Sequence, residues 1–132
     1  MTGSTPLRIL LVDDHDVILE RAAETLSPPC TIVGAVKDGP SALDAVQALQ
    51  PDVIVLDVSL PGMSGLEVAG RLRRAGVKAA IVFLTIHNEQ ELVRAAMAAG
   101  GSGYVEKTFL STDLTVAVNE AHAGRRYVSQ MK

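Results

Sequence analysis

Short aliphatic runs alternate along the chain with longer segments of helical periodicity. Five of these runs are continuous rather than alternating: Ile9–Val12, Ile32–Val36, Val53–Leu56, Ala80–Leu84 and the shorter Gly103–Val105. Continuous apolar runs bounded by turn residues are typical of strands that are covered on both faces. The pattern therefore predicts five buried strands.

The segments between the runs repeat their apolar residues every three or four positions, as one face of an α-helix does. These positions are Ile18, Ala22 and Leu26; Ala42, Ala45, Val46 and Leu49; Leu66, Ala69 and Leu72; Leu92, Ala95, Ala96 and Ala99; and Leu114, Ala117, Val118 and Ala121. Gly39-Pro40 marks one helix start, and Gly76 and Gly100 follow two helix ends. Five strand–helix units in series predict an α/β fold, because right-handed crossovers then give a doubly wound, five-stranded parallel sheet.

Length and charge limit the classes of function. A chain of 132 residues suits one compact domain, and no apolar run approaches the roughly 18 residues that a membrane helix needs. The net charge is −3, and the scattered Lys and Arg residues form no basic stripe, so we expect no direct contact with nucleic acid. The single Cys30 lies in an apolar run without a disulfide partner. It predicts a buried, unreactive thiol and a cytoplasmic location.

Acidic, hydroxyl and ammonium groups follow the predicted strands. Asp13 and Asp14 come after the first strand, Asp57 after the third, Thr85 after the fourth and Lys107 after the fifth. Ligands of open α/β sheets bind beyond the carboxyl ends of the strands, so these groups are expected to share one site. An aspartate pair alone could be a helix cap. Asp57, however, ends a strongly apolar strand, where a charge is costly unless it is paired or bound to a metal.

Converging carboxylates raise one another's pKa, and a hard divalent cation removes that penalty. Mg²⁺ prefers oxygen ligands, and no His or Cys cluster accompanies the acids, which argues against zinc. Neither His15 nor His122 belongs to a ligand cluster in the sequence, and we assign neither a catalytic role. With Lys107 and Thr85 nearby, Asp57 is suited to be the nucleophile of a phosphoryl transfer.

These motifs resemble the receiver domain of two-component response regulators, over about residues 7–124. They are Val12-Asp13-Asp14, Asp57-Val58-Ser59-Leu60-Pro61-Gly62-Met63-Ser64-Gly65, Leu84-Thr85 and Gly103-Tyr104-Val105-Glu106-Lys107. Asp14-His15 and the ending Ala-Gly-Arg-Arg-Tyr-Val-Ser are similar to the NarL/FixJ-type subfamily. The resemblance implies a flavodoxin-like (βα)5 sheet with strand order 2-1-3-4-5.

The resemblance also implies the roles of the acidic residues. Asp57 would accept a phosphoryl group from a sensor histidine kinase. The side chains of Asp14 and Asp57, with the backbone carbonyl of Ser59, would bind Mg²⁺ or Mn²⁺, and Asp13 would act through water. Such a domain catalyses only its own phosphorylation and slow dephosphorylation, so it is not an enzyme in the usual sense.

Three further residues would carry the response. Lys107 would pair with the phosphoryl group, while Thr85 moves toward it and the ring of Tyr104 turns inward. Phosphorylation adds charge and strong hydrogen-bond acceptors, which would bias a two-state arrangement of the fourth helix, fifth strand and fifth helix. Plain core packing is the alternative role of Tyr104.

The chain departs from the family pattern at two positions. Thr108 replaces the usual proline after the lysine, which predicts a trans peptide bond because a non-proline cis bond costs about 2.5–4 kcal/mol. Ile86 stands where a small residue is common, and its bulk would slow both the arrival and the loss of the phosphoryl group. Ser59 and His87 occupy positions that tune dephosphorylation, with ordinary surface variation as the alternative.

The predicted organisation is a tail over residues 1–6, a receiver domain over 7–124, and the start of a linker or C-terminal tail over 125–132. The subfamily resemblance implies a DNA-binding output domain beyond this chain, through which transcription would be regulated. The alternatives are a stand-alone receiver that acts by protein contact and a degenerate receiver that serves as a binding module. A homodimer is possible through the first and fifth helices, or through the face from the fourth helix to the fifth.

Two other classes of function fit less well. A hydrolase with an aspartyl nucleophile needs a dedicated general acid or base near Asp57 and a substrate cap, and the sequence shows no inserted cap segment. A flavodoxin-like cofactor site needs a glycine-rich phosphate loop after the first strand, where Asp13-Asp14-His15 stands instead.

Overall fold

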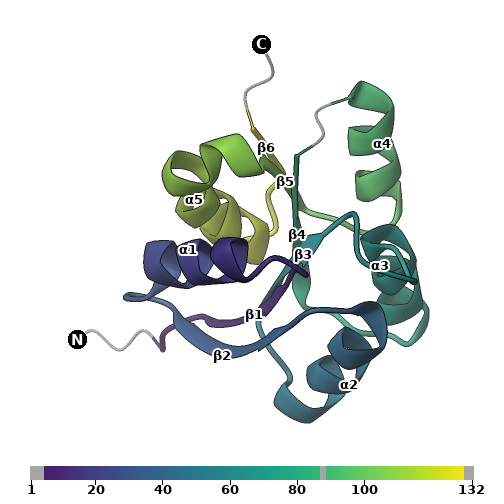
Figure 1. Ribbon diagram of the computed structural model, residues 1–132, viewed down its shortest axis with the longest axis horizontal. Helices are drawn as coiled ribbons and strands as arrows, with labels where there is room; N and C mark the ends of the chain where they lie inside the picture. Colours follow the sequence, from purple (N-terminus) through teal and green to yellow (C-terminus); the bar gives the residue numbers. More distant parts are fainter. Residues whose placement is uncertain (1–4, 87–88, 130–132) are drawn as a thin grey trace.

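A computed structural model describes residues 5–86 and 89–129, and its centre is a parallel sheet (Figure 1). The strands are β1 (Arg8–Val12), β2 (Thr31–Val36), β3 (Val53–Asp57), β4 (Ala80–Thr85), β5 (Gly103–Glu106) and β6 (Tyr127–Val128). Their order is β2-β1-β3-β4-β5-β6, and every neighbouring pair is parallel. The predicted order 2-1-3-4-5 is confirmed, and β6 is added outside β5.

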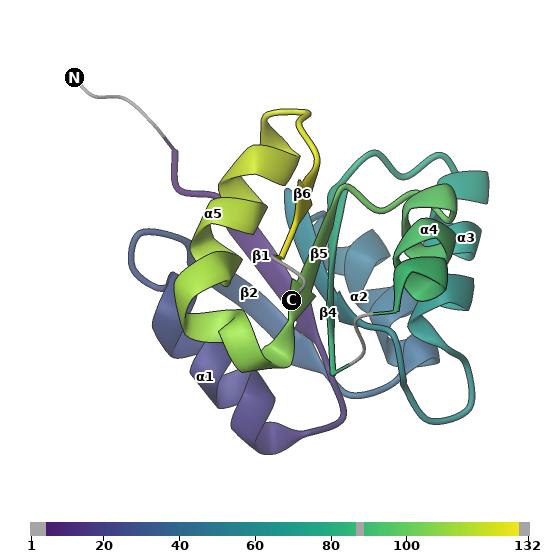
Figure 2. The same cartoon turned by 90° about the horizontal axis from the view of Figure 1, so that it is seen from above.

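In the described part of the chain, five α-helices connect the strands, on both sides of the sheet. They are α1 (Asp16–Leu26), α2 (Gly39–Leu49), α3 (Gly65–Arg74), α4 (Gln90–Ala98) and α5 (Leu110–His122), and a short 3-10 turn, η1 (Lys107–Phe109), precedes the last of them. Figure 2 shows α1 and α5 on one face of the sheet and α2, α3 and α4 on the other. This is the doubly wound α/β arrangement that the sequence predicted.

The core consists of two layers of apolar side chains, one on each face of the sheet. In β1, Ile9 and Leu11 pack with α1 and α5, whereas Leu10 and Val12 pack with α2 and α3. All five residues of β3 are buried, while every residue of the edge strand β2 is at least partly exposed. The apolar runs are continuous because a central strand must satisfy both layers at once.

The segment after α5 turns back onto the sheet. Tyr127–Val128, which were predicted to belong to a linker or tail, pair with β5 as β6. Ser129, which is buried, donates its backbone N–H to the Tyr104 carbonyl at 2.8 Å and its hydroxyl to Asp113 Oδ2 at 2.9 Å. The Glu106 N–H also donates to the Ser129 hydroxyl, at 3.2 Å. The last described residues therefore pack against β5 and α5.

Three smaller expectations can be compared with the structure. Cys30 is buried, and its burial raises the pKa of the thiol, as expected for an unreactive cysteine. Among the described residues the cis peptide bonds are Ser27–Pro28 and Pro28–Pro29, so the bond between Lys107 and Thr108 is trans, as predicted. Within residues 5–86 and 89–129, none of the helices has the length and apolar character needed to cross a bilayer.

Candidate functional site

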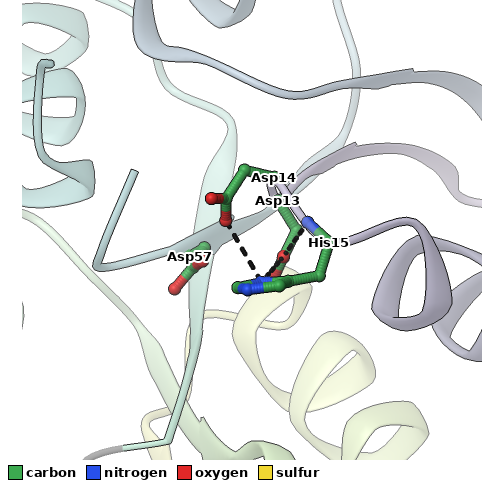
Figure 3. A group of neighbouring side chains, drawn as sticks. All are labelled: Asp13, Asp14, His15 and Asp57. Atoms are coloured by element: carbon green, nitrogen blue, oxygen red, sulfur yellow. Dashed lines mark hydrogen bonds and ion pairs between the residues drawn. The ribbon is translucent and has the colours of Figure 1, made fainter. Parts of the chain in front are cut away.

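Three carboxylates meet at the carboxyl end of the sheet. Asp13 and Asp14 follow β1, and Asp57 is the last residue of β3. These two strands are parallel neighbours, with Val12 opposite Leu56, so their ends lie side by side. Figure 3 shows the three acids with His15 at this edge, and each of the four side chains offers a ligand atom within 4.8 Å of the others. The predicted convergence of these three acids is confirmed.

Burial makes the charge of Asp57 costly. The side chains of Asp13 and Asp57 are 3% and 2% exposed, whereas that of Asp14 is 33% exposed. Burial, and then the charge of Asp13, raise the pKa of Asp57, although the Ser59 N–H and Lys107 act in the opposite direction. The cost of burying the Asp57 charge and its repulsion by Asp13 outweigh the stabilisation from the Ser59 N–H and Lys107. Additional positive charge would therefore stabilise the ionised site.

Lys107 supplies part of that positive charge from the end of β5. Its ammonium lies 3.3 Å from Asp57 Oδ2, to which it donates a hydrogen bond, and 2.9 Å from Asp13 Oδ2. The contact with Asp13 is an ion pair without hydrogen-bond geometry, so the buried Oδ2 atom has no hydrogen-bond donor among the described residues. The Lys107 ammonium therefore contacts two of the three carboxylates, and an excess of negative charge remains at the cluster.

The donor chemistry fits a divalent metal ion. The candidate ligands are carboxylate oxygens, one of them buried without a hydrogen bond, and the cluster as a whole could hold an ion. Ser59, whose carbonyl was predicted to be a ligand, is exposed in the β3–α3 loop, and its N–H donates to Asp57 Oδ1 at 3.1 Å. Oxygen donors of this kind suit hard divalent cations.

The close packing of α3 against the end of β3 explains why a glycine, Gly65, stands eight residues after Asp57. It is the first residue of α3, and its N–H donates to the Val58 carbonyl at 2.8 Å. A Cβ atom at this position would overlap the Asp57 carbonyl oxygen and lie 2.9 Å from the Asp57 carbonyl carbon. Only glycine allows α3 to approach the strand end this closely, and this approach fixes the backbone of Asp57.

Thr85 and Tyr104, on the neighbouring strands β4 and β5, are in contact through their side chains. Thr85 is fully buried at the end of β4, and Tyr104 on β5 is 1% exposed within the layer that contains α2, α3 and α4. Burial raises the pKa of Tyr104 to about 12, while a hydrogen bond between its side chain and that of Thr85 has the opposite effect. The contact agrees with the predicted pair, and the apolar surroundings of the ring agree equally with core packing. The switch role stays a prediction.

Ile86 follows Thr85 directly and is 72% exposed. Its predicted effect on access of the phosphoryl group remains a prediction. His87, which together with Ser59 was expected to tune dephosphorylation, lies outside the described residues.

His15 belongs to the cluster, so the prediction that it lies outside any ligand cluster is wrong. Its Nδ1 atom lies 3.1 Å from Asp13 Oδ1 and 3.2 Å from Asp14 Oδ1. The available signal was the position of His15 directly after the aspartate pair, but its spacing alone does not fix the direction of the ring. His122 lines a cleft of about 760 Å³ with Asp52, which precedes β3, so it lies at the opposite end of the sheet.

The comparison with protein families identifies the arrangement. A family model of the response regulator receiver domain matches residues 9–119. The chain belongs to the response regulator receiver domain family. Receiver domains are signalling domains rather than classical enzymes, and the resemblance to NarL/FixJ-type regulators is confirmed by the relatives of this receiver domain.

The nitrate/nitrite response regulators NarL and NarP of Escherichia coli K12 are 34% and 36% identical to this receiver domain over 132 residues. The alignments cover 98% of the chain and 61% of each relative, so the chain spans about three fifths of their length. The signal receiver domain of NarL from Mycobacterium tuberculosis has a TM-score of 0.87 at 31% identity, covering 92% of this chain and all of that one. A LuxR-family response regulator from Aurantimonas sp. also gives 0.87 at 33% identity, covering 95% and 91% of the two chains.

Proposed function

We propose that this receiver domain is a phosphorylation-activated switch and that Asp57 accepts a phosphoryl group from a sensor histidine kinase. The observation that carries the proposal is the position of the buried Asp57 carboxylate beside a second buried acid, Asp13, with the ammonium of Lys107 in contact with both. Carboxylates with a pKa raised by burial and by a neighbouring acid are concentrated at functional sites, and the pKa of Asp57 is raised by these two causes.

In the proposed transfer, an oxygen of Asp57 forms a bond to phosphorus as the bond from phosphorus to the histidine nitrogen breaks. The nitrogen keeps the electron pair of that bond and can take a proton from water. The product on Asp57 is a mixed anhydride. Lys107, already 3.3 Å from Asp57 Oδ2, would compensate charge on the phosphoryl oxygens, and the Thr85 hydroxyl would donate to one of them.

The same proposal assigns the metal ligands. Asp14, Asp57 and the carbonyl of Ser59 would hold Mg²⁺ or Mn²⁺ directly, and Asp13 would act through water. When bound, the ion supplies positive charge that offsets both the carboxylates and the transferred phosphoryl group. The excess of negative charge at the cluster and the unbonded Oδ2 of Asp13 support this assignment.

The response would pass through Thr85 and Tyr104. Recruiting the Thr85 hydroxyl to a phosphoryl oxygen must alter its hydrogen bond to Tyr104, which lies on β5 in the layer that also contains residues of α4. This rearrangement would reach a DNA-binding output domain in a longer protein and so regulate transcription, and homodimer formation would be a further consequence. The alternative is a receiver that acts alone through protein contacts. A cytoplasmic location belongs to the same proposal.

The deciding experiment is intact mass spectrometry after incubation with acetyl phosphate. We expect a gain of one phosphoryl group that requires Mg²⁺, is absent in Asp57→Asn and is unchanged in the control Asp44→Asn, which alters an exposed aspartate of α2. Labelling that persists in Asp57→Asn would show that the acceptor is another residue. Continuous release of phosphate without a labelled intermediate would favour the hydrolase instead.

A further inference from the structure

We infer that the imidazole of His15 is a nitrogen ligand of the acidic cluster, which makes the site selective for first-row transition ions such as Co²⁺ over Mg²⁺. This inference rests on the proposed function, because it assumes that the cluster binds a divalent cation.

The first observation is the distance between donor atoms. Nδ1 of His15 lies 3.1 Å from Asp13 Oδ1 and 3.2 Å from Asp14 Oδ1. Two adjacent ligands of an octahedral ion, each about 2.1 Å from the metal, are about 3 Å apart. The ring nitrogen therefore already stands, relative to the directly bound carboxylate of Asp14, at the separation that shared coordination requires. Figure 3 shows the ring directed at the acids, with Asp57 nearby.

The second observation is that the two carboxylate oxygens of Asp13 have different partners. Its Oδ1 atom faces His15, accepting the backbone N–H of that residue at 2.9 Å, and its Oδ2 atom faces Lys107. The bond from the His15 backbone fixes the start of the side chain beside the cluster. Lys107 approaches Asp13 from the buried side, so the nitrogen of His15 and the ammonium of Lys107 contact different oxygens of Asp13.

The third observation is that, among the described residues, the ring of His15 makes no polar contact outside the cluster. His15 occupies the N-cap position of α1, but its side chain makes no capping hydrogen bond, and it is 63% exposed. Its polar contacts among the described residues are with the carboxylates of Asp13 and Asp14. Coordination would therefore replace contacts inside the cluster and would disturb neither the core nor the helix.

A nitrogen donor changes which ions the site prefers. Mg²⁺ gains little from imidazole, whereas Co²⁺, Ni²⁺ and Zn²⁺ bind imidazole well, and affinity rises from Co²⁺ through Ni²⁺ to Cu²⁺ and falls again at Zn²⁺. Carboxylate oxygens also suit Mg²⁺, so the three acids alone would favour these ions less than a site that includes imidazole. With His15 included, the ratio of the Mg²⁺ dissociation constant to the Co²⁺ dissociation constant should be large.

The test is a titration with Co²⁺ and, separately, with Mg²⁺, followed by calorimetry and by the visible absorption of bound Co²⁺. We expect His15→Ala to weaken Co²⁺ binding by about 10- to 100-fold and to change its absorption spectrum, without weakening Mg²⁺ binding. His122→Ala is the matched control, because it removes a histidine at the opposite end of the sheet, and it should leave both affinities unchanged.

The outcomes separate this inference from the proposed function. If His15→Ala leaves the affinity and spectrum of Co²⁺ unchanged, or weakens both ions equally, His15 is not a selective ligand and the inference is wrong. In either case, Mg²⁺ binding and Asp57 labelling in the parent chain would leave the proposed function intact. If the parent chain binds neither ion, the metal site itself fails, and the proposed function fails with it.

Discussion

Removing the ammonium of Lys107 should strongly destabilise the metal-free protein. We expect Lys107→Met to lower the free energy of unfolding at pH 7 by about 3–5 kcal/mol, the usual cost of removing one partner from a buried ion pair. The methionine fills a similar volume, but it leaves Asp13 and Asp57 buried beside each other without a compensating charge. Because a domain of this kind is stable by only about 5–15 kcal/mol, the variant should lose a large share of its stability.

The distances indicate which interactions are lost. At an effective dielectric constant of about 20, unit charges separated by the 2.9 Å to Asp13 and the 3.3 Å to Asp57 attract each other by roughly 5–6 kcal/mol per pair. The cost of removing the charged groups from water offsets most of this attraction in the parent chain. That cost remains for both carboxylates when only the lysine is removed.

Urea unfolding in the presence of a chelator, followed by circular dichroism, measures the effect. In an Asp57→Asn background the cost of Lys107→Met should fall by more than about 1 kcal/mol, because one of the two buried carboxylates is then neutral. Added Mg²⁺ should restore part of the lost stability by binding the folded state. Lys78→Met, at an exposed lysine, should have little effect. Equal costs of Lys107→Met in both backgrounds would refute the electrostatic explanation.

Two more predictions concern the surroundings of Asp57. The raised pKa of Tyr104, about 12, means that its contribution to stability is complete below pH 10 and is lost between pH 10 and 12. The loss should total about 2–3 kcal/mol relative to Tyr104→Phe, and parallel alkaline unfolding curves for the two proteins would contradict it. Gly65→Ala should lower the free energy of unfolding, measured in urea, by at least about 1–3 kcal/mol and slow the labelling of Asp57, because the new Cβ atom would overlap the backbone of Asp57. Gly70→Ala, in the same helix with only the flexible end of Arg74 nearby, should instead gain about 0.5–1 kcal/mol.

Much of this fold can be predicted from the sequence because each central strand must be apolar on both faces. The run Val53–Leu56, for example, differs from β3 only by Asp57. The grouping of Asp13, Asp57 and Lys107 is predictable for a related reason, since parallel strands bring their carboxyl ends to one edge. No fine geometry is needed for that conclusion.

Two features could not be predicted because they depend on contacts without periodicity. Tyr127–Val128 is too short for an apolar pattern to reveal a strand, and its place depends on the hydrogen bonds of Ser129 to Tyr104 and Asp113. The ring of His15 turns toward the acids in a local turn that begins with its own backbone N–H. A histidine after an aspartate pair can direct its ring toward the acids or toward solvent, so the sequence does not predict the direction of the His15 ring.

The short strand β6 also affects how the molecule behaves among its own copies. An exposed strand edge invites another chain to add a strand, and this is a common route to aggregation. Here the two residues of β6, which follow the charged pair Arg125 and Arg126, pair with the outer edge of β5. The next residue, Ser129, is held by its hydrogen bond to Asp113. Such a short border offers few free backbone groups, so edge-to-edge association on this side of the sheet should be discouraged even at high protein concentration.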